Sequence, residues 1–542
     1  PPRHPDLHRY RGPLAEPAAA VLPVLITPVL ITSDVLADLS CTYGISGGGA
    51  NDRVASTGSF TFQLNNSTSN SAGLLGYYSI GHPNCRAGFQ LGAIVRLGLT
   101  YDGTTYYKFL GAVDSVTPDA GLYRSRRVSV TALDAIDAFA KFTLWGLAAR
   151  QNWTSSDLVQ LLLDDATNAY WTLGTGLLGT STRLARTAGV GSLNASALVR
   201  DRVIANGQDT YALALDNTDD RSSTTLSELA RISASELGYA YMRGDTTGGG
   251  TFVWESRATR AALTTPSYTC TDTMTGLGTG RSRDQITNHV QVGITSREVG
   301  VTPEILYRLE SVPSLQASQT VTFLGPYRDP NQSTAKIAGL DMIEPVASND
   351  YAMNTAADGS GTDVTAQHTV TTYAGANGVR FDITNHSGGV SYVTLLQSRG
   401  TAIRFTPIVA EAEDIDSQNT YGDHLLSAPM PYQNDAGKGA GAAAYLLNLY
   451  KSSAVQAQEL RLAGYDDTTI TQVVAREVGD RVDVAETVSG VNAAFVIHQV
   501  SLDIRAGGRA VAASWTLAPL DTSSVWLLGS ATLGETTRLA YL

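Results

Sequence analysis

The sequence predicts a mainly β protein with an α+β insertion, built as two β-barrels, an α+β domain and an inserted β-sandwich. Its composition, with 52 Gly, 24 Tyr and only 16% charged residues, favours short strands and turns over long helices. Its length of 542 residues corresponds to about three to four domains. Both ends of the chain also carry short segments in which apolar and polar residues alternate, as half-buried strands do.

The first barrel is expected at residues 22–140, after an extended arm at 1–21 that is rich in Pro and Ala. Phe60, Phe62 and Leu64 alternate with polar residues in its clearest strand. The strands expected in this barrel lie at 54–66, 92–97, 106–113 and 127–132. A Tyr101-Asp102-Gly103 turn separates the second from the third, and a short helix at 133–139 ends the unit.

Residues 141–275 are expected to form a separate α+β domain. Ser155-Ser156-Asp157 caps an amphipathic helix. A capping box of Thr225 and Glu228 begins a second helix, which stops at Gly238. A Gly-rich turn then predicts a β-hairpin with strands at 239–243 and 251–255.

The second barrel is expected to be split, over residues 276–314 and 404–520. A strand at 288–292 has no closing strand nearby, so its partners are expected among the segments 480–484, 495–500 and 514–517. The intervening residues 315–403 alternate short strands with Gly- and Asp-rich turns, as in a small β-sandwich. A helix is expected at 439–449. The tail at 521–542 is apolar enough to need a docking partner on a neighbouring subunit.

Charge and cysteine usage exclude several classes of function. A net charge of −12 opposes attraction to nucleic acid phosphates or anionic lipid. The three cysteines, at positions 41, 85 and 270, are too far apart for a disulfide framework or a paired zinc site, so buried thiols are expected. Pro23 and Pro28 interrupt the apolar run 18–31, which argues against a membrane span or a signal peptide and for folding in the cytoplasm.

Several short motifs resemble catalytic or binding sites but lack the context that the chemistry needs. Residues 44–48 match the GxSxG string, but a polar loop follows where a nucleophile elbow needs a helix. Residues 435–439 contain a Gly-Lys pair without the remaining residues of a P-loop. Residues 358–363 lack the side chains that a calcium loop has at its third, fifth and twelfth positions, so a hairpin turn is expected.

Acidic and histidine residues supply the remaining candidates. Carboxylates clustered after a strand, at Glu411, Glu413, Asp414 and Asp416, could cut glycosidic bonds or bind calcium, but a solvated face is expected. The histidines are scattered, at His289, His386, His424 and His498, without a metal-binding pair. We therefore assign no catalytic, cofactor-binding or metal-binding residue.

Motifs distributed over about residues 30–540 together resemble one known family. They are Ala55-Ser56-Thr57-Gly58-Ser59-Phe60-Thr61-Phe62-Gln63-Leu64-Asn65-Asn66, Phe109-x-Gly111-x-Val113-Asp114, Leu226-Ser227-Glu228-Leu229-Ala230, Glu236-Leu237-Gly238 with the hairpin to Ser256-Arg257, Asn288-His289-Val290-x-Val292, Tyr421-Gly422, Gly479-Asp480-Arg481-Val482 and Trp526-Leu527-Leu528-Gly529 to Thr536-Thr537-Arg538-Leu539. In this order they resemble the tail hub family of long-tailed bacteriophages, also called tail-tip or baseplate hub and minor tail proteins.

The resemblance implies a structural protein of the virion tail tip, assembled in the host cytoplasm, and not an enzyme. In such hubs each subunit contributes two tail-tube-like barrels, so that a homotrimer surrounds a central channel with pseudo-six-fold symmetry. The implied partners are the tail tube or distal tail protein, the tape measure protein and tip or receptor-binding proteins, while DNA passes the channel without specific binding. No cofactor is implied, and the insertion at 315–403 lies outside the minimal hub pattern.

A second hypothesis is a carbohydrate-binding or depolymerising tail or surface protein. It rests on the inserted sandwich, the acids at 411–416 and the Tyr and Trp content.

Overall fold

The structure is a computed structural model that describes residues 30–539 apart from 122–124, 145–146, 148, 168–194, 217–222, 281–285, 452–455, 506–507, 521–524 and 527–537. The predicted arm at 1–21 lies outside the described residues. So does the predicted tail at 521–542, apart from the paired β28 (Val525–Trp526) and β29 (Arg538–Leu539). Strands predominate over helices, which confirms the mainly β prediction.

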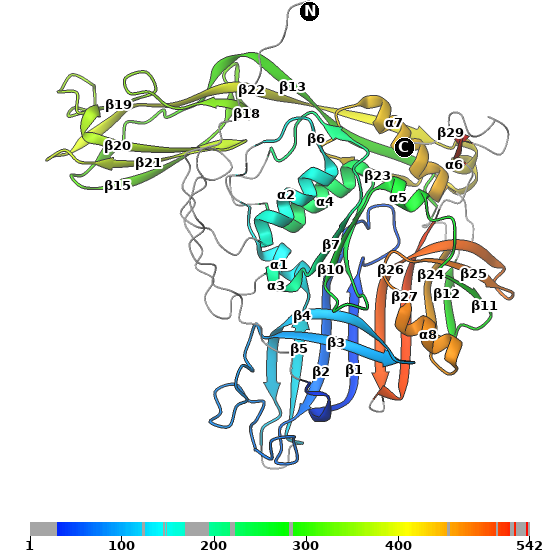
Figure 1. Ribbon diagram of the computed structural model, residues 1–542. Coiled ribbons are helices and arrows are strands. Elements are labelled where there is room, and N and C mark those ends of the chain that lie inside the picture. The colour runs from blue at the N-terminus through cyan, green and yellow to red at the C-terminus, as the bar shows by residue number, and fades with distance from the viewer. Residues whose placement is uncertain are drawn as a thin grey trace, which may run out of the picture.

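One sheet of eleven strands combines strands from the N-terminal and C-terminal parts of the described chain (Figure 1). Its main path runs β12 (Gly276–Gly280), β24 (Gln456–Ala463), β27 (Ala510–Pro519), β26 (Val491–Arg505), β1 (Val35–Gly44), β2 (Ser56–Asn65), β5 (Arg127–Leu133), β4 (Thr104–Pro118) and β3 (Ile94–Tyr101). Beside it, β25 (Arg481–Glu486) pairs with β26 and with β11 (Tyr268–Thr271). The antiparallel pairing of β1 with β26, with Cys41 opposite Leu502, joins the N-terminal strands to the C-terminal ones.

The N-terminal strands follow their predicted patterns. Phe60, Phe62 and Leu64 of β2 are buried, and the rings of Phe60 and Phe62 stack at 4.7 Å. The turn between β3 and β4 places Asp102 and Gly103 at φ values of 44° and 74°. Both angles are left-handed, as the two-residue turn of a twisted hairpin requires. The predicted turn is therefore confirmed.

The α+β part has a three-stranded sheet in the order β7 (Asp201–Ile204), β10 (Thr251–Glu255) and β9 (Tyr239–Arg243). A short pair, β6 (Trp153–Thr154) and β8 (Thr210–Tyr211), lies apart from it. The helices are α1 (Ala135–Lys141), α2 (Ser155–Thr167), α3 (Ala195–Leu198), α4 (Thr225–Glu236) and α5 (Arg257–Ala261). Figure 1 shows α2 and α4 side by side, and the predicted hairpin of β9 and β10 is confirmed.

The predicted capping box of α4 is wrong by one residue. Thr224 accepts a hydrogen bond from the backbone N–H of Ser227, and the Ser227 side chain accepts one from the backbone of Thr224. Glu228 does not cap the helix because its side chain is fully buried on the inner face of α4. At the other end, Leu237 adopts the left-handed conformation that closes the helix just before Gly238.

Two long strands form a ribbon across the molecule. Strand β13 (His289–Arg308) runs antiparallel to β22 (Ser391–Glu413), and β23 (Leu425–Met430) lies parallel to β13. Helix α7 (Ala436–Tyr450) packs one face of this sheet, and the short α6 (Ile415–Tyr421) links β22 to β23. Helix α8 (Asp467–Ala475) follows β24, and short 3-10 turns lie at η1 (Thr32–Asp34) and η3 (Thr365–Gln367).

The pairing expected for the strand at 288–292 is wrong. Val290 lies opposite Ala412 and Leu426, whereas the segment 480–484 contributes to β25 and pairs with β11 and β26. The closing strand comes from the insertion itself, because β22 continues without a break from the inserted region into the ribbon. The predicted domain boundaries remain a proposal.

The inserted region is a two-sheet unit at the far end of the ribbon (Figure 1). One sheet has the order β15 (Thr320–Pro326), β21 (Gly378–Asn385) and β20 (His368–Ala374). The other is formed on β22 by β14 (Ser314–Leu315), β18 (Ala338–Ile343) and β19 (Tyr351–Asn354), and β16 (Arg328–Asp329) pairs with β17 (Gln332–Lys336). Phe381 of one sheet and Leu396 of the other belong to a shared core. We refer to this unit as the distal unit.

Candidate functional site: buried polar junctions between the sheets

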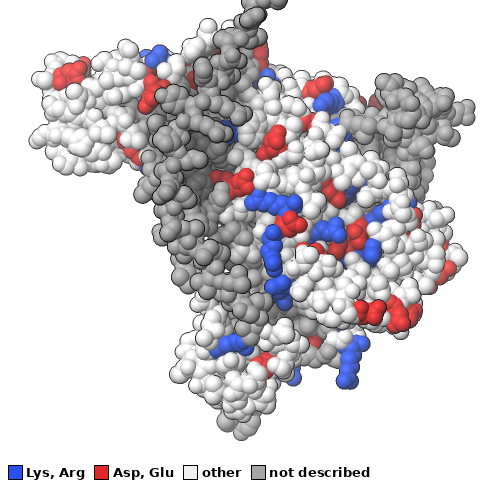
Figure 2. Space-filling view, in the orientation of Figure 1, with Lys and Arg blue, Asp and Glu red and all other residues white. Residues whose placement is uncertain are grey.

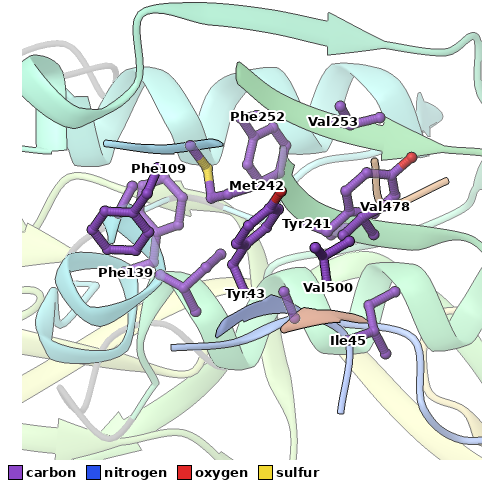
Figure 3. Close-up of a cluster of buried hydrophobic side chains, with 14 of the residues drawn as sticks. Tyr43, Ile45, Phe109, Phe139, Tyr241, Met242, Phe252, Val253, Val478 and Val500 are labelled. Atoms are coloured by element: carbon purple, nitrogen blue, oxygen red, sulfur yellow. The ribbon is translucent and has the colours of Figure 1, made fainter. Parts of the chain in front are cut away.

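The centre of the molecule is an apolar core to which distant parts of the chain contribute. Figure 3 shows Tyr43 of β1, Phe109 of β4, Phe252 of β10 and Val500 of β26 in one cluster. The large sheet and the α+β part therefore share a core. Polar groups enclosed at the edges of this core must find partners inside the protein, because each unpaired one carries a desolvation cost.

The first such junction is an ion pair between Lys108 of β4 and Glu477, which follows α8. The Lys108 side chain is fully buried, and its Nζ also donates to the carbonyl oxygens of Val474 at 3.2 Å and Arg476 at 2.8 Å. The ammonium group thus has three acceptors. This arrangement fixes the segment after α8 against the first half of the large sheet.

Glu477 accepts further hydrogen bonds through its other oxygen. Tyr43 donates its hydroxyl to Glu477 Oε2 at 2.9 Å, and the backbone N–H of Gly244 donates to the same atom at 3.0 Å. Burial and the Glu477 carboxylate raise the pKa of Tyr43 well above its usual value, so this hydroxyl stays protonated. One carboxylate therefore connects β1, β4, the hairpin of β9 and β10, and the C-terminal part of the chain.

A second junction surrounds Arg260 of α5. Its Nε donates to Glu255 at 2.8 Å, and Tyr241 donates to the other oxygen of that carboxylate at 2.8 Å. The guanidinium carbon of Arg260 lies 3.2 Å from the centre of the Tyr239 ring, and Arg53 lies over the same ring at 5.0 Å. The ring faces attract the two cations, which offsets their mutual repulsion.

His498 completes this second junction as a neutral side chain. Its Nδ1 lies 2.8 Å from the carbonyl oxygen of Gly47 and must donate there, so Nε2 accepts from Arg260 at 2.7 Å. Burial, and then the charges of Arg260 and Arg53, lower the pKa of His498 well below its usual value. His498 is therefore a packed, hydrogen-bonded residue.

The geometry around Gly47 also explains the GxSxG string at 44–48. Strand β1 ends at Gly44, and a loop without a helix follows. A nucleophile elbow requires a helix at that point, so the expectation of a loop is confirmed. In the same loop Asn51 donates to the carbonyl oxygen of Ser427 at 3.0 Å, which ties the loop to β23.

A third junction involves the Gly-Lys pair at 435–439. Asp435 caps α7, and Lys438 Nζ lies 2.5 Å from an oxygen of Asp209, whose carboxylate is almost completely buried. Arg257 contacts the other oxygen of Asp209 at 3.1 Å. Lys438 therefore neutralises a buried acid, and the absence of a P-loop sequence agrees with this structural role.

A fourth junction anchors the ribbon to the helices. Arg297 of β13 donates to one oxygen of Asp216 from Nε at 2.9 Å and from Nη2 at 2.8 Å. Arg231 of α4 contacts the other oxygen of Asp216 at 3.2 Å and Glu228 at 3.1 Å. Tyr432 donates to Glu228 in turn. This chain of contacts explains why Glu228 faces inward.

The acids singled out in the sequence do not converge on one point. Glu411 and Glu413 are exposed at the end of β22, where Gln291 donates to Glu411 at 2.7 Å. Asp414 caps α6 by accepting from the backbone of Ser417, and this bond together with Lys451 lowers its pKa. Asp416 lies exposed in the first turn of α6. In the described parts of the chain, no three His, Cys, Asp or Glu side chains are arranged to hold a metal ion.

The remaining candidates have local partners. His289 contacts Asp423 at 3.2 Å, and His424 contacts the carbonyl oxygen of Tyr421 at 3.1 Å. The other histidine, His386, contacts Thr369, and Asp358 accepts from Ser360 within the turn at 358–363. Cys41 and Cys270 are buried free thiols, and Cys85 is a half-buried one.

A cavity of about 540 Å³ lies between the α+β sheet and the Lys108 junction. Its polar lining is already engaged: Glu477 and Glu255 belong to the junctions above, and one oxygen of Asp245 accepts three backbone N–H groups. The cavity thus has few groups left to orient a substrate.

The sequence did not reveal the four buried polar junctions described above. The position of Lys108 within an apolar run was the one usable signal.

The face of the molecule shown in Figure 2 carries mixed charge. On the face in Figure 2, acidic and basic side chains lie among one another, and uncharged side chains cover most of the area. Among the described residues, no helix has the length and apolar character needed to cross a bilayer.

The sequence matches no protein-family model and no curated protein. Solved structures of three tail proteins are similar to the chain and cover 90% of it. The 43 kDa tail protein of prophage MuSo2 from Shewanella oneidensis is 11% identical, with 95% of that chain covered and a TM-score of 0.45. The tail protein from Neisseria meningitidis MC58 is 10% identical, with 95% covered and a TM-score of 0.42. The prophage tail protein gp18 from Listeria monocytogenes EGD-e is 8% identical, with 88% covered and a TM-score of 0.36.

Proposed function

We propose that this chain is a structural subunit of a long-tailed phage, a tail hub that joins the tail tube to the tip and catalyses no reaction. The observation that carries the proposal is the single large sheet that combines N-terminal strands (β1 to β5) with C-terminal strands (β24 to β27). One buried ion pair fixes β4 of that sheet to the segment after α8, and another anchors the ribbon to the α+β part. Such locking suits a part that transmits force and shape rather than one that opens around a substrate.

The main path of the large sheet ends at β3 and at β12, and its side branch through β25 ends at β11. An edge strand presents unpaired N–H and C=O groups, which readily pair with another chain. We propose that these edges pair between copies, so that a homotrimer closes into a pseudo-six-fold ring around a channel for DNA. Its neighbours would be the tail tube or distal tail protein, the tape measure protein and the tip or receptor-binding proteins, in the tail tip of the virion.

The oligomeric state tests this proposal. Mass measurement in solution and negative-stain imaging should show a ring of about three times the 57.2 kDa chain mass, alone or with tail-tube protein. Ile94→Lys on β3 should abolish the ring, because a buried unpaired charge opposes association. Val488→Lys is the matched control, since Val488 is 94% exposed in the turn between β25 and β26. A strictly monomeric particle, even beside tail-tube protein, would argue against the hub.

The second candidate is a carbohydrate-binding or depolymerising role. The observation that favours it is the position of the distal unit at the far end of the ribbon, from which it could reach a cell surface (Figure 1). Release of reducing sugar from host envelope, abolished by Glu413→Gln, would support depolymerisation. Binding of envelope polysaccharide without release would support recognition alone.

A further inference from the structure

The connection between β2 and β3, residues 66–93, exposes four large apolar side chains. The exposed fractions are 42% for Leu74, 41% for Leu75, 45% for Ile80 and 53% for Leu91. We call these four side chains the loop patch. Exposed apolar groups gathered on one segment are typical of a surface that another segment covers.

The loop patch is held in place by asparagine side chains. Asn66 accepts from the backbone N–H of Tyr78 at 2.7 Å. Asn70 donates to the carbonyl oxygen of Leu74 at 2.7 Å, and Asn84 donates to that of Leu75 at 3.0 Å. The backbone that carries the exposed leucines is therefore fixed. The exposure of Leu74 and Leu75 follows from the structure of the loop itself, because an asparagine side chain donates a hydrogen bond to the backbone carbonyl group of each.

The described chain begins beside this loop. Asp34 is buried and accepts from the backbone N–H and the hydroxyl of Ser71, at 2.6 Å and 2.5 Å, and from the Tyr78 hydroxyl at 2.6 Å. Asp34 ends the turn η1, and Ile31 just before it packs against the core. The next residue outward, Leu30, is 87% exposed. The N-terminal segment thus enters the fold at the base of the loop patch.

The segment that precedes Leu30 matches the patch in chemistry. Residues 18–29 read Ala-Ala-Ala-Val-Leu-Pro-Val-Leu-Ile-Thr-Pro-Val and carry no charge. The loop itself has Arg86 as its one ionic side chain at neutral pH, and that group lies against Tyr77 and Tyr78. Twelve extended residues reach up to about 40 Å, and the loop itself contacts the start of the described chain, where Ser71 and Tyr78 bind Asp34.

We infer that residues 18–29 lie on the loop patch of their own chain, as an extended apolar segment. Attachment at Leu30 gives the segment an effective concentration on the order of millimolar at the patch. A second copy of the chain would have to compete with that local concentration. The occupant is therefore the chain's own N-terminal segment, and the inference does not depend on the proposed ring.

Cross-linking of the full-length chain tests the inference. Leu25→Cys and Leu75→Cys are combined in a Cys85→Ser background, since Cys41 and Cys270 are buried. A short bismaleimide should join the two new thiols within one chain, as mapped by peptide mass. The matched control replaces Leu75→Cys by Val488→Cys. Val488 is also an exposed apolar residue, at 94%, but it lies in the β25–β26 turn. The yield with Leu75→Cys should be about tenfold higher, because proximity sets the rate.

Two outcomes would overturn the inference: equal yields at the two positions, or products that join two different chains. As a second measurement, Leu22, Leu25 and Ile26 are changed together to Ser, and amide hydrogen exchange is followed at 71–76. Exchange there should become faster, while exchange in β26 stays unchanged. Unaltered exchange at 71–76 would also overturn it. Both measurements use dilute chain below the concentration at which any ring forms, so they can fail while the hub proposal holds.

Discussion

Lys108 and Glu477 lie 369 residues apart in the chain and form an ion pair whose lysine is fully buried. Two charges taken out of water recover their desolvation cost only when other hydrogen bonds complete their shells, as Tyr43 and Gly244 do here for the carboxylate. The pair therefore specifies how two distant segments sit together. It makes the junction sensitive to the loss of either partner alone.

Removing only the lysine should be severe. In Lys108→Met, Glu477 keeps its buried charge without its ion-pair partner, and the carbonyl groups of Val474 and Arg476 lose their donor. The expected loss in the free energy of unfolding is about 3–5 kcal/mol. Hydrogen exchange of the β1 and β4 amides, which reports local opening, measures it.

The double variant Lys108→Met with Glu477→Leu is the control for this prediction. It removes both charges and should recover more than half of the loss, because no uncompensated ion remains. If the single variant loses less than about 1 kcal/mol, the pair does not organise the junction in the way proposed.

The ribbon should depend on one arginine. Arg297→Met leaves Asp216 buried against Arg231 alone, and the expected loss is about 2–4 kcal/mol at this contact. Small-angle scattering should then show a larger radius of gyration, because the ribbon carries the distal unit. Arg380→Met is the control: Arg380 pairs with the partly exposed Asp382 inside the distal unit, so its loss should cost about 1 kcal/mol or less. Equal behaviour of the two variants would contradict the anchoring role.

Local patterns in the sequence predicted much of this fold, but they did not predict the contacts between residues that are far apart in the chain. The alternation in β2 and the Asp102-Gly103 turn are properties of a few neighbouring residues, and both predictions are confirmed. The alternation of Val290 and Val292 fits any partner strand with an apolar face, so it could not reveal that β22 supplies the partner. Local spacing identifies a strand and leaves its neighbours undetermined.

The junctions were missed for a related reason. Lys108 alternates with Tyr107 and Phe109 as a solvent-facing residue would, and only a partner 369 residues away allows its burial. Glu228 occupies a position that a capping box favours, yet Tyr432 draws it inward. In both cases a distant residue decides whether a charge is exposed, so a lysine within an apolar run is only a hint, and no window of sequence contains the partner.

Stability should depend on pH through Asp134. Burial raises the pKa of this carboxyl from 3.8 to about 7 in the folded protein. The folded state therefore binds the proton more tightly, and the stability this group contributes is full below pH 3.8 and is lost as the pH rises through about 7. Asp134→Asn should remove this dependence of the free energy of unfolding on pH, which amounts to about 4 kcal/mol at most. It keeps the acceptor that caps Ile136 at the start of α1.

Denaturant titrations at several pH values measure the effect of Asp134→Asn. The control is Asp466→Asn, because hydrogen bonds from Thr469 lower the pKa of the exposed Asp466. Its contribution has the opposite sign, being present above pH 3.8 and lost as the pH falls. If the free energy of unfolding of Asp134→Asn changes between pH 4 and 7 as much as that of the wild type, the Asp134 carboxyl does not titrate in that range.

The seam between β1 and β26 can be tested at a single glycine. Gly44 has a φ of 114°, and a Cβ there would lie 2.3 Å from the carbonyl oxygen of His498 and 2.8 Å from a methyl carbon of Val478. Gly44→Ala should therefore combine a left-handed strain with a steric clash, at about 3 kcal/mol or more. Gly103→Ala is the matched control. Its φ of 74° carries the same left-handed strain, but no atom lies within 4 Å of an added Cβ. This variant should lose about 1 kcal/mol of the free energy of unfolding. Hydrogen exchange across β1 and β26 separates the two effects. If both variants lose the same amount, the close approach at Gly44 does not hold the halves of the sheet together.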